Sequence, residues 1–515
     1  MSQLGSLEGL ELHTDLGALD FRRCAPPMSE ANRTLSQIAI RGGGFTLLGQ
    51  GMRAALQIVT VVVLSRLLGP DDFGLIAMVL VVVAAGEILR DFGLFPAAVQ
   101  AERITQQQKT NLFWINTAIG VTFGLLLIVL APFIARGLSD SRLADLFPYL
   151  ALVFVANGLQ AQHQAELVRG LRIRANVMCE VGAQVAGMAA AVALAVGGFG
   201  VWALVAQPIV VSVSTGIARV LASRWCPGLP RRTPGMMSFF LFGRNLSLAQ
   251  LTSYAASNVD TIVIGATLGA GPLGVYSRAY QIFSLPVNQA LVPLTNVALP
   301  VLSRAARHER KRASTFERAH YVVALPMVCG FICLAVLAQP TVDLLLGEQW
   351  TDSGPILAAF AVGGAFQALS FVGYWVFLAL GATGALLRYN LITKPLHAAL
   401  IIVAVPHGIN AVAWAYATAL FVAWPICAVA TARVGGLPAR RTLALGAVAL
   451  LCGAVCGGAA QMVVSSLQLS GAAALGLGLL GAAVGAVICL CAARTLRQQV
   501  ILTLQSFTKS KGTQL

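Results

Sequence analysis

Polar and charged side chains recur at helical spacing inside the apolar stretches of the first hundred residues. Thr46, Gln50, Arg53, Gln57 and Thr60 follow one another at steps of four, three, four and three residues. These steps place the side chains on one face of a helix, because an α-helix has about 3.6 residues per turn. We therefore expect this face to meet something polar, while the opposite face meets lipid or protein.

A second apolar run carries Glu87, Arg90 and Asp91, about one turn apart. An arginine at the centre of a membrane helix costs roughly 2.5 to 3.5 kcal/mol on insertion scales, so it normally faces a bundle interior or a watery pathway. Arg90 either binds an anionic substrate or neutralises the two acids as a helix-packing ion cluster. For Arg53, which has no acid within a turn on its own helix, a substrate role is favoured.

The composition is that of a polytopic membrane protein. Of 515 residues, 57% are hydrophobic and 11% are charged, which is more apolar surface than one soluble core can bury. We expect helices throughout, because an open strand cannot satisfy its backbone in lipid. Fourteen apolar runs have the length that crosses roughly 30 Å of hydrocarbon. Their centres lie near Ile58, Val82, Phe123, Phe154, Ala189, Val210, Tyr254, Leu285, Phe331, Gln367, Leu400, Tyr416, Leu451 and Leu479.

The basic residues explain the net charge of +15 through membrane topology. Of 35 Lys and Arg, 24 fall on loops or a tail expected inside, among them Arg219, Arg388 and Lys394. Only Arg66, Arg136 and Arg142 fall outside. This bias predicts an even number of spans with both termini in the cytoplasm, and it removes the motive for nucleic-acid binding.

An internal repeat divides the chain. The segment from Gln50 to Gly74 matches Gln250 to Gly274 at an offset of 200, and a polar stripe recurs there. The repeat predicts two six-helix lobes in parallel orientation, with the transport site between them. The expected parts are a polar, disordered cytoplasmic tail (1–36), an N-lobe with helices 1 to 6 (37–225), a C-lobe with helices 7 to 12 (236–433), two further helices (440–496) and a second cytoplasmic tail (497–515).

Three motifs carry a family resemblance: LSRLLGPDDFGLIAMV (64–79), EILRDFGLFPAAVQ (87–100) and ITQQQKTNLFWIN (104–116). With NVDTIVIGATLGAGPLGVYSRAYQIFSLP (258–286), the chain resembles the polysaccharide transporters, the Wzx-type flippases related to the MATE and peptidoglycan-precursor flippases. The resemblance implies two six-helix bundles with two added C-terminal helices. It also implies a substrate, an oligosaccharide on undecaprenyl diphosphate that is carried to the outer leaflet. Polysaccharide polymerase and chain-length machinery are candidate partners.

Candidate site residues follow from this chemistry. A planar arginine fork suits phosphate, and amide or hydroxyl side chains suit sugar hydroxyls. The residues expected to contact substrate are Arg53, Arg90, Arg278, Arg244, Gln50, Gln57, Asn258, Tyr280 and Gln281. Those expected to couple an ion or to pair with a charge are Glu87, Asp91 and Asp260.

Several of these residues have a second interpretation. Arg244 opens a helix and either contacts substrate or extends to the inner headgroups. Asp260 either binds a proton or sodium ion or pairs with Arg278. His163 in the fourth span is more often a packed polar residue than a proton relay, since it has no visible partner in the sequence.

Two rival functions remain. A MATE-like antiporter that exports drugs or metabolites shares the architecture, although a cation exporter needs acids to dominate its cavity. A membrane glycosyltransferase or polymer ligase needs a substantial polar outer loop, whereas the most polar one here is LGEQWTDSG (346–354). The sequence predicts no enzyme, no metal and no cofactor, because it holds neither a CxxC pair nor a GxxxxGK[ST] motif.

Overall fold

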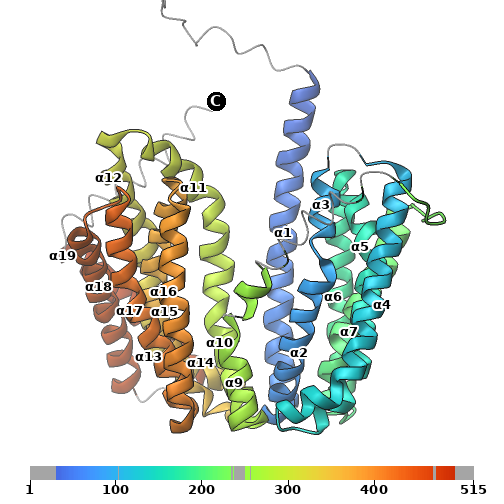
Figure 1. The fold of residues 1–515 in the computed structure, drawn as a ribbon. Coiled ribbons are helices and arrows are strands. Elements are labelled where there is room, and N and C mark those ends of the chain that lie inside the picture. Colours follow the sequence, from blue (N-terminus) through green and yellow to red (C-terminus); the bar gives the residue numbers. More distant parts are fainter. Residues whose placement is uncertain are drawn as a thin grey trace, which may run out of the picture.

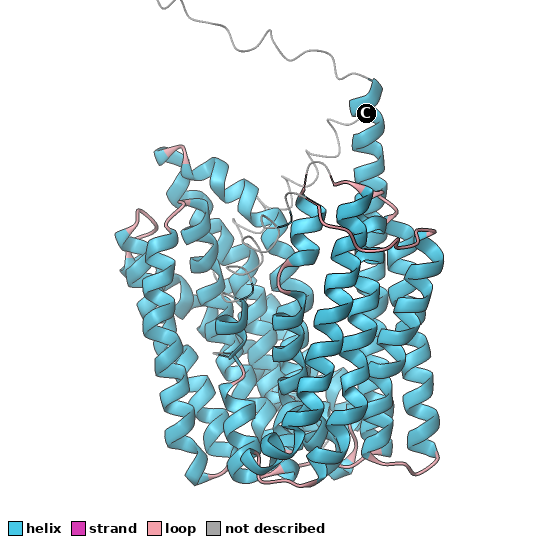
Figure 2. Ribbon diagram, turned by 45° about the vertical axis from the view of Figure 1, so that its right-hand side comes forward, coloured by secondary structure: helices cyan, strands magenta, loops and turns pink. Residues whose placement is uncertain are grey.

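The computed structural model describes residues 30–101, 104–233, 250–255, 257–467 and 471–492, with the single positions 236 and 247. Every regular element in these ranges is a helix, and none is a strand (Figure 2). The first and last expected tails lie outside these ranges, except that the first described helix already begins at Glu30.

The first half of the chain forms one group of helices, drawn in blue to green in Figure 1. The helices are α1 (Glu30–Leu67), α2 (Pro70–Asp91), α3 (Leu94–Gln100), α4 (Gln106–Gly137), α5 (Arg142–Arg169), α6 (Ile173–Val196) and α7 (Val201–Ser223).

The second half forms a neighbouring group, drawn in green to red. Its α-helices are α9 (Val259–Leu268), α10 (Ala270–Pro286), α11 (Val292–Ala306), α12 (Glu309–Ala319), α13 (Leu325–Val336), α14 (Ala338–Leu345), α15 (Ser353–Ala379), α16 (Thr383–Ala404), α17 (Ile409–Arg433), α18 (Ala439–Ser466) and α19 (Gly471–Ala492). Two π-helical turns, Val287–Leu291 and His320–Ala324, join α10 to α11 and α12 to α13, and short 3₁₀ turns lie at Glu348–Trp350 and Val405–His407.

The predicted class, an all-α polytopic membrane protein, is confirmed. In the described ranges, thirteen helices are long and apolar enough to cross a membrane, and they contain thirteen of the fourteen predicted centres. The remaining centre, Tyr254, lies in a stretch that is described only in part, before the ten-residue helix α9. The count of fourteen and the two six-helix lobes therefore stay predictions.

Many of the basic residues assigned to inner loops lie in membrane-length helices instead, most of them near a helix end, and Arg219 and Lys394 are two examples. Arg219 belongs to α7, where it is 5% exposed, and Lys394 lies near the middle of α16. The loop assignment was therefore wrong for both. For Arg219 it failed because position in the sequence cannot detect a compensating partner on another helix, here Glu180 of α6.

The two halves meet where α2 and α10 begin. A Cβ built on Gly74 would overlap the carbonyl of Ala270, and one built on Gly274 would overlap the carbonyl of Pro70. Each residue in this contact is related to another by the offset of 200 seen in the repeat. The contact is therefore reciprocal, as it is where a two-fold axis relates two elements.

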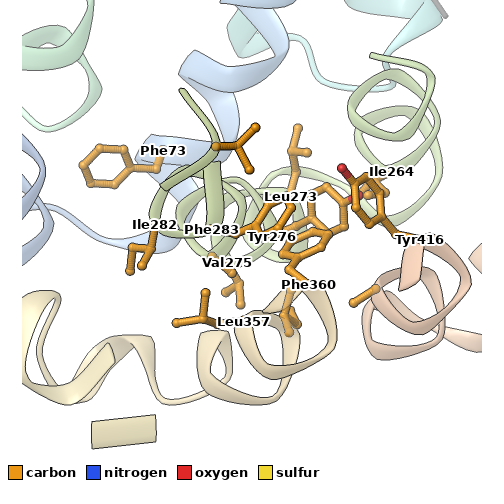
Figure 3. Packing of buried hydrophobic residues seen from close by; sticks show 14 of the residues in the cluster. Phe73, Ile264, Leu273, Val275, Tyr276, Ile282, Phe283, Leu357, Phe360 and Tyr416 are labelled. Carbon is orange, nitrogen blue, oxygen red and sulfur yellow. The ribbon is translucent and has the colours of Figure 1, made fainter. Parts of the chain in front are cut away.

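Aromatic side chains fill the second half around α15. Of the residues in its apolar segment, 67% are buried, against 22% in α19. Phe360 of α15 packs against Phe283 and Tyr276 of α10 and against Tyr416 of α17, with ring centroids 4.9 to 5.5 Å apart (Figure 3). This packing fixes α10, which carries several of the predicted site residues.

The reciprocal glycine contact generates a prediction about stability. Gly74→Ala and Gly274→Ala should each lower the thermal unfolding midpoint of the protein in detergent, because the added methyl group meets backbone of the other half. The double variant should lower it by less than the sum of the two, since both changes act on one contact. Gly182→Ala in α6 is the control, because nothing lies within 4 Å of the added atom. An unchanged midpoint for Gly74→Ala would contradict the close approach.

Candidate functional site

A cavity of about 340 Å³ lies between the two halves. Helices α1, α2, α6, α7 and α10 line it, and its apolar lining residues include Phe73 and Leu204. Its polar lining residues are Gln57, Thr60, Gln184, Gln207, Arg278 and Gln281. The cavity therefore presents four carboxamides, one hydroxyl and one guanidinium, and no carboxylate among its described lining residues.

Arg278 carries the only charge among those lining residues. Its guanidinium carbon lies 4.2 Å from the centroid of the Phe73 ring. Its Nε is buried without a hydrogen-bond partner, and no ion pair to it occurs within the described ranges. A cation–π contact is worth about 0.5 to 2 kcal/mol but leaves the charge uncompensated. Arg278 is thus placed to meet an anionic group in the cavity.

A chain of hydrogen-bonded polar side chains, here called the interior network, runs through the first half of the molecule. Its members are Arg53, Glu87, Arg90, Asn157, Gln160, Asn176, Glu180 and Arg219. They come from α1, α2, α5, α6 and α7, so the network joins five helices.

One end of the interior network is the Glu87–Arg90 ion pair on α2. Glu87 Oε2 accepts hydrogen bonds from Arg90 Nε at 3.0 Å and from Asn157 Nδ2 at 3.1 Å. Gln160 Nε2 donates to Asn157 Oδ1 at 2.5 Å. Asp91, the last residue of α2, interacts electrostatically with Arg90. This is the contact pattern of a helix-packing ion cluster, and the substrate role of Arg90 stays a prediction.

The other end is centred on Glu180 of α6. Arg219 donates to Gln160 Oε1 at 2.9 Å, to Asn176 Oδ1 at 3.1 Å and to Glu180 Oε1 at 2.7 Å. Arg53 donates to the other oxygen of the same carboxylate. Arg53, which has no acid within a turn on its own helix, therefore pairs with one on α6.

The predicted substrate residues divide between these places. Gln57, Arg278 and Gln281 line the cavity together. Arg53 and Arg90 belong to the interior network and do not line this cavity. Their expected substrate contacts stay predictions.

Residues predicted around the start of the second half have partners of their own. Tyr276 donates a hydrogen bond to Asp260 Oδ2 at 2.7 Å, so the contact partner of Asp260 here is a tyrosine and not Arg278. Asn258 Nδ2 donates to the carbonyl of Tyr254 at 2.9 Å. Tyr280 is 37% exposed, and its ring centroid lies 5.5 Å from that of Phe360 and 6.1 Å from that of Tyr416.

Three further residues complete the comparison. Gln50 is exposed on α1, and Arg244 lies outside the described residues. His163 is buried, with Nδ1 2.8 Å from Ser223 Oγ and edge contacts to Phe113 and Trp225. Packing accounts for His163 without a relay.

Sequence reasoning missed residues on α6 and α7. Asn176, Glu180 and Gln184 follow at steps of four on α6, and Arg219 and Ser223 do so on α7. Residues four apart share a helix face. The same search for polar stripes that singled out α1 would therefore have found Glu180, the partner of Arg53.

The interior network predicts how abundance responds to charge removal. Arg90→Ala should lower the amount of inserted protein, because taking one partner from a buried ion pair costs about 3 to 5 kcal/mol. Adding Glu87→Gln should restore abundance, which quantitative immunoblotting of membranes would measure. Arg142→Ala is the control, since its side chain is 57% exposed in its pair with Asp140. Normal abundance of Arg90→Ala alone would argue against the pair as a packing element.

Comparisons with known proteins place the chain in a family. The sequence profile of a family described as "Polysaccharide biosynthesis protein" matches residues 63–355. The chain is 25% identical to the lipopolysaccharide biosynthesis protein WzxC of Escherichia coli (strain K12) over 342 residues, which cover 65% of this chain and 69% of WzxC. It is 27% identical to the succinoglycan biosynthesis transport protein ExoT of Rhizobium meliloti (strain 1021) over 326 residues, which cover 62% of this chain and 65% of ExoT.

The fold resembles a solved structure, "Lipid II flippase MurJ, inward closed conformation", with a TM-score of 0.66. That likeness covers 87% of this chain and 98% of the other at 12% identity, and it concerns the fold alone. The family profile, however, matches more than half of the sequence. The chain belongs to the polysaccharide biosynthesis protein family, in agreement with its resemblance to Wzx-type transporters.

Proposed function

We propose that the protein is a flippase that carries an oligosaccharide linked to undecaprenyl diphosphate across the membrane by alternating access. The observation that carries this proposal is Arg278, which has no ion-pair partner among the described residues, in a cavity lined by four glutamines between the two halves. Export of the translocated units would supply surface polysaccharide synthesis, such as exopolysaccharide, O-antigen or capsule. The names of the relatives, one in lipopolysaccharide biosynthesis and one in succinoglycan transport, support the same class of substrate.

The lining chemistry fits the parts of such a substrate. A guanidinium offers two parallel N–H donors to a phosphate and keeps its charge at any physiological pH. Carboxamides both donate and accept, so Gln57, Gln184 and Gln207 suit sugar hydroxyls. A cation exporter would need acids in this cavity, and its described lining residues include none. The polyprenyl tail remains in lipid.

We also propose where the protein resides and which parts of the chain move. The protein resides in a bacterial inner membrane with both termini in the cytoplasm. An N-lobe of residues 37–225 and a C-lobe of residues 236–433 move against each other, with residues 440–496 forming two added helices. Polysaccharide polymerase and chain-length machinery would use the exported units.

Deleting the gene tests the substrate class. We expect a lipid-linked saccharide to accumulate on the cytoplasmic leaflet, because synthesis continues while export stops. Mass spectrometry of the extracted lipids would identify it. Accumulation of a drug or metabolite, with normal lipid-linked saccharide, would favour an antiporter instead.

Substitutions at Arg278 test the site. Arg278→Ala should lower polysaccharide export per inserted molecule by about tenfold or more, since hydrogen bonds to a charged group contribute about 1.5 to 3 kcal/mol. Arg278→Lys should keep part of the export, because it keeps the charge but loses the fork. The control is Arg136→Ala. The Arg136 guanidinium also lies over a phenylalanine ring, at the exposed end of α4. Full export by Arg278→Ala would count against the cavity as the phosphate site.

Reporter fusions test the orientation. A fusion after Arg312 in α12 should report the cytoplasm, and one after Gln349 should report the outer side, because one membrane-length helical stretch, Lys311–Val336, lies between them. Equal signals would refute the proposed topology.

A further inference from the structure

The two oxygens of the Glu180 carboxylate accept hydrogen bonds from different donors. Arg219 and Asn176 bind Oε1, at 2.7 and 3.0 Å, and Arg53 binds Oε2. The side chains of Glu180 and Arg219 are 19% and 6% exposed, whereas that of Arg53 is 36% exposed. Arg53 is therefore the most exposed of these three side chains.

Of the two arginines, only Arg53 can break its hydrogen bond to Glu180 without leaving a buried charge unpaired. When it leaves, Glu180 keeps a charge-assisted hydrogen bond to Arg219 and another bond to Asn176. Arg219 in turn is held by Gln160 and Asn176. Since a buried carboxylate without partners is costly, this support makes an exchange at Arg53 feasible and an exchange at Arg219 unfavourable.

The Arg53–Glu180 pair also lies next to the cavity. Gln57 follows Arg53 by four residues on α1, and Gln184 follows Glu180 by four residues on α6. Both glutamines line the cavity. Because residues four apart lie on one face, about 6 Å along the axis, the ion pair forms the next layer of the same α1–α6 contact.

We propose that Glu180 is a positioning residue that holds the Arg53 guanidinium in place until a phosphate group of the substrate binds beside Gln57. The phosphate then replaces the Glu180 carboxylate as the hydrogen-bond acceptor of Arg53. The inference rests on the proposed function. The entering anion takes over the Oε2 position, while Arg219 and Asn176 retain the carboxylate. No bond other than hydrogen bonds is made or broken. Arg53 and Arg278 would then contact the anionic part of the substrate from opposite halves.

An ion pair that serves only to tie α1 to α6 would behave differently. In that case Glu180→Gln and Arg53→Ala would lower stability alike, and neither would change the affinity for an anion. With exchange, the two substitutions have opposite effects on binding, because one removes the competitor and the other removes the binding group.

The test measures binding of undecaprenyl diphosphate to the purified full-length protein in detergent by isothermal titration. Glu180→Gln should bind it about tenfold more tightly than the wild type, Arg53→Ala should bind it more weakly, and Glu180→Gln with Arg53→Ala should match Arg53→Ala alone. The double variant excludes a gain through the released Arg219. Glu166→Gln is the matched control, since Glu166 pairs with Lys109 elsewhere in the first half, and it should bind as the wild type does.

Each contrary result has a definite meaning. Unchanged affinity of Glu180→Gln, with binding still lost in Arg278→Ala, would overturn the exchange while the proposed function stands. Absence of binding to the wild type would overturn both. An equal gain with phosphatidylglycerol would show a general lipid-phosphate site and overturn the assignment to the diphosphate carrier. Should Glu180→Gln fail to accumulate, Glu180→Asp shortens the reach to Arg53 and should give a smaller gain, and no gain would overturn the exchange.

Discussion

Charged groups inside the membrane helices need partners, and this need organises the interior of the protein. In the first half, the guanidinium groups of Arg53, Arg90 and Arg219 meet the carboxylates of Glu87 and Glu180. Carboxamides bridge the two ion-paired ends. Because an ion withdrawn from water costs several kcal/mol unless paired, these contacts constrain where α1, α2, α6 and α7 can sit.

Arg278, by contrast, has no ion-pair partner among the described residues. Its guanidinium lies over Phe73, without a carboxylate among the described lining residues of the cavity. A cavity that holds one uncompensated cation and several amides is suited to a ligand with an anionic head and many hydroxyls. The chain belongs to a polysaccharide biosynthesis family, and the lipid-linked oligosaccharide proposed as its substrate has those properties.

The sequence predicts the fold class well, because apolar length and arginine placement are local properties. The repeat was also visible in the sequence, and the reciprocal contacts of Gly74 and Gly274 agree with it. The site was only partly predictable. Gln57, Arg278 and Gln281 do come together, but the partner of Arg53 lies 127 positions away. No pattern on one helix can reveal such a pairing, although the stripe on α6 that contains Glu180 could have been found.

The most direct measurement of the central claim is translocation in reconstituted vesicles. Lipid-linked saccharide would be extracted from the deletion strain and labelled with a fluorophore on its sugar. Its passage from the inner to the outer leaflet would be followed as the fluorescence that becomes accessible to a membrane-impermeant quencher. We expect faster equilibration with the wild-type protein than in empty vesicles, and a rate close to that of empty vesicles with Arg278→Ala. Equal rates in empty and wild-type vesicles would contradict a flippase function.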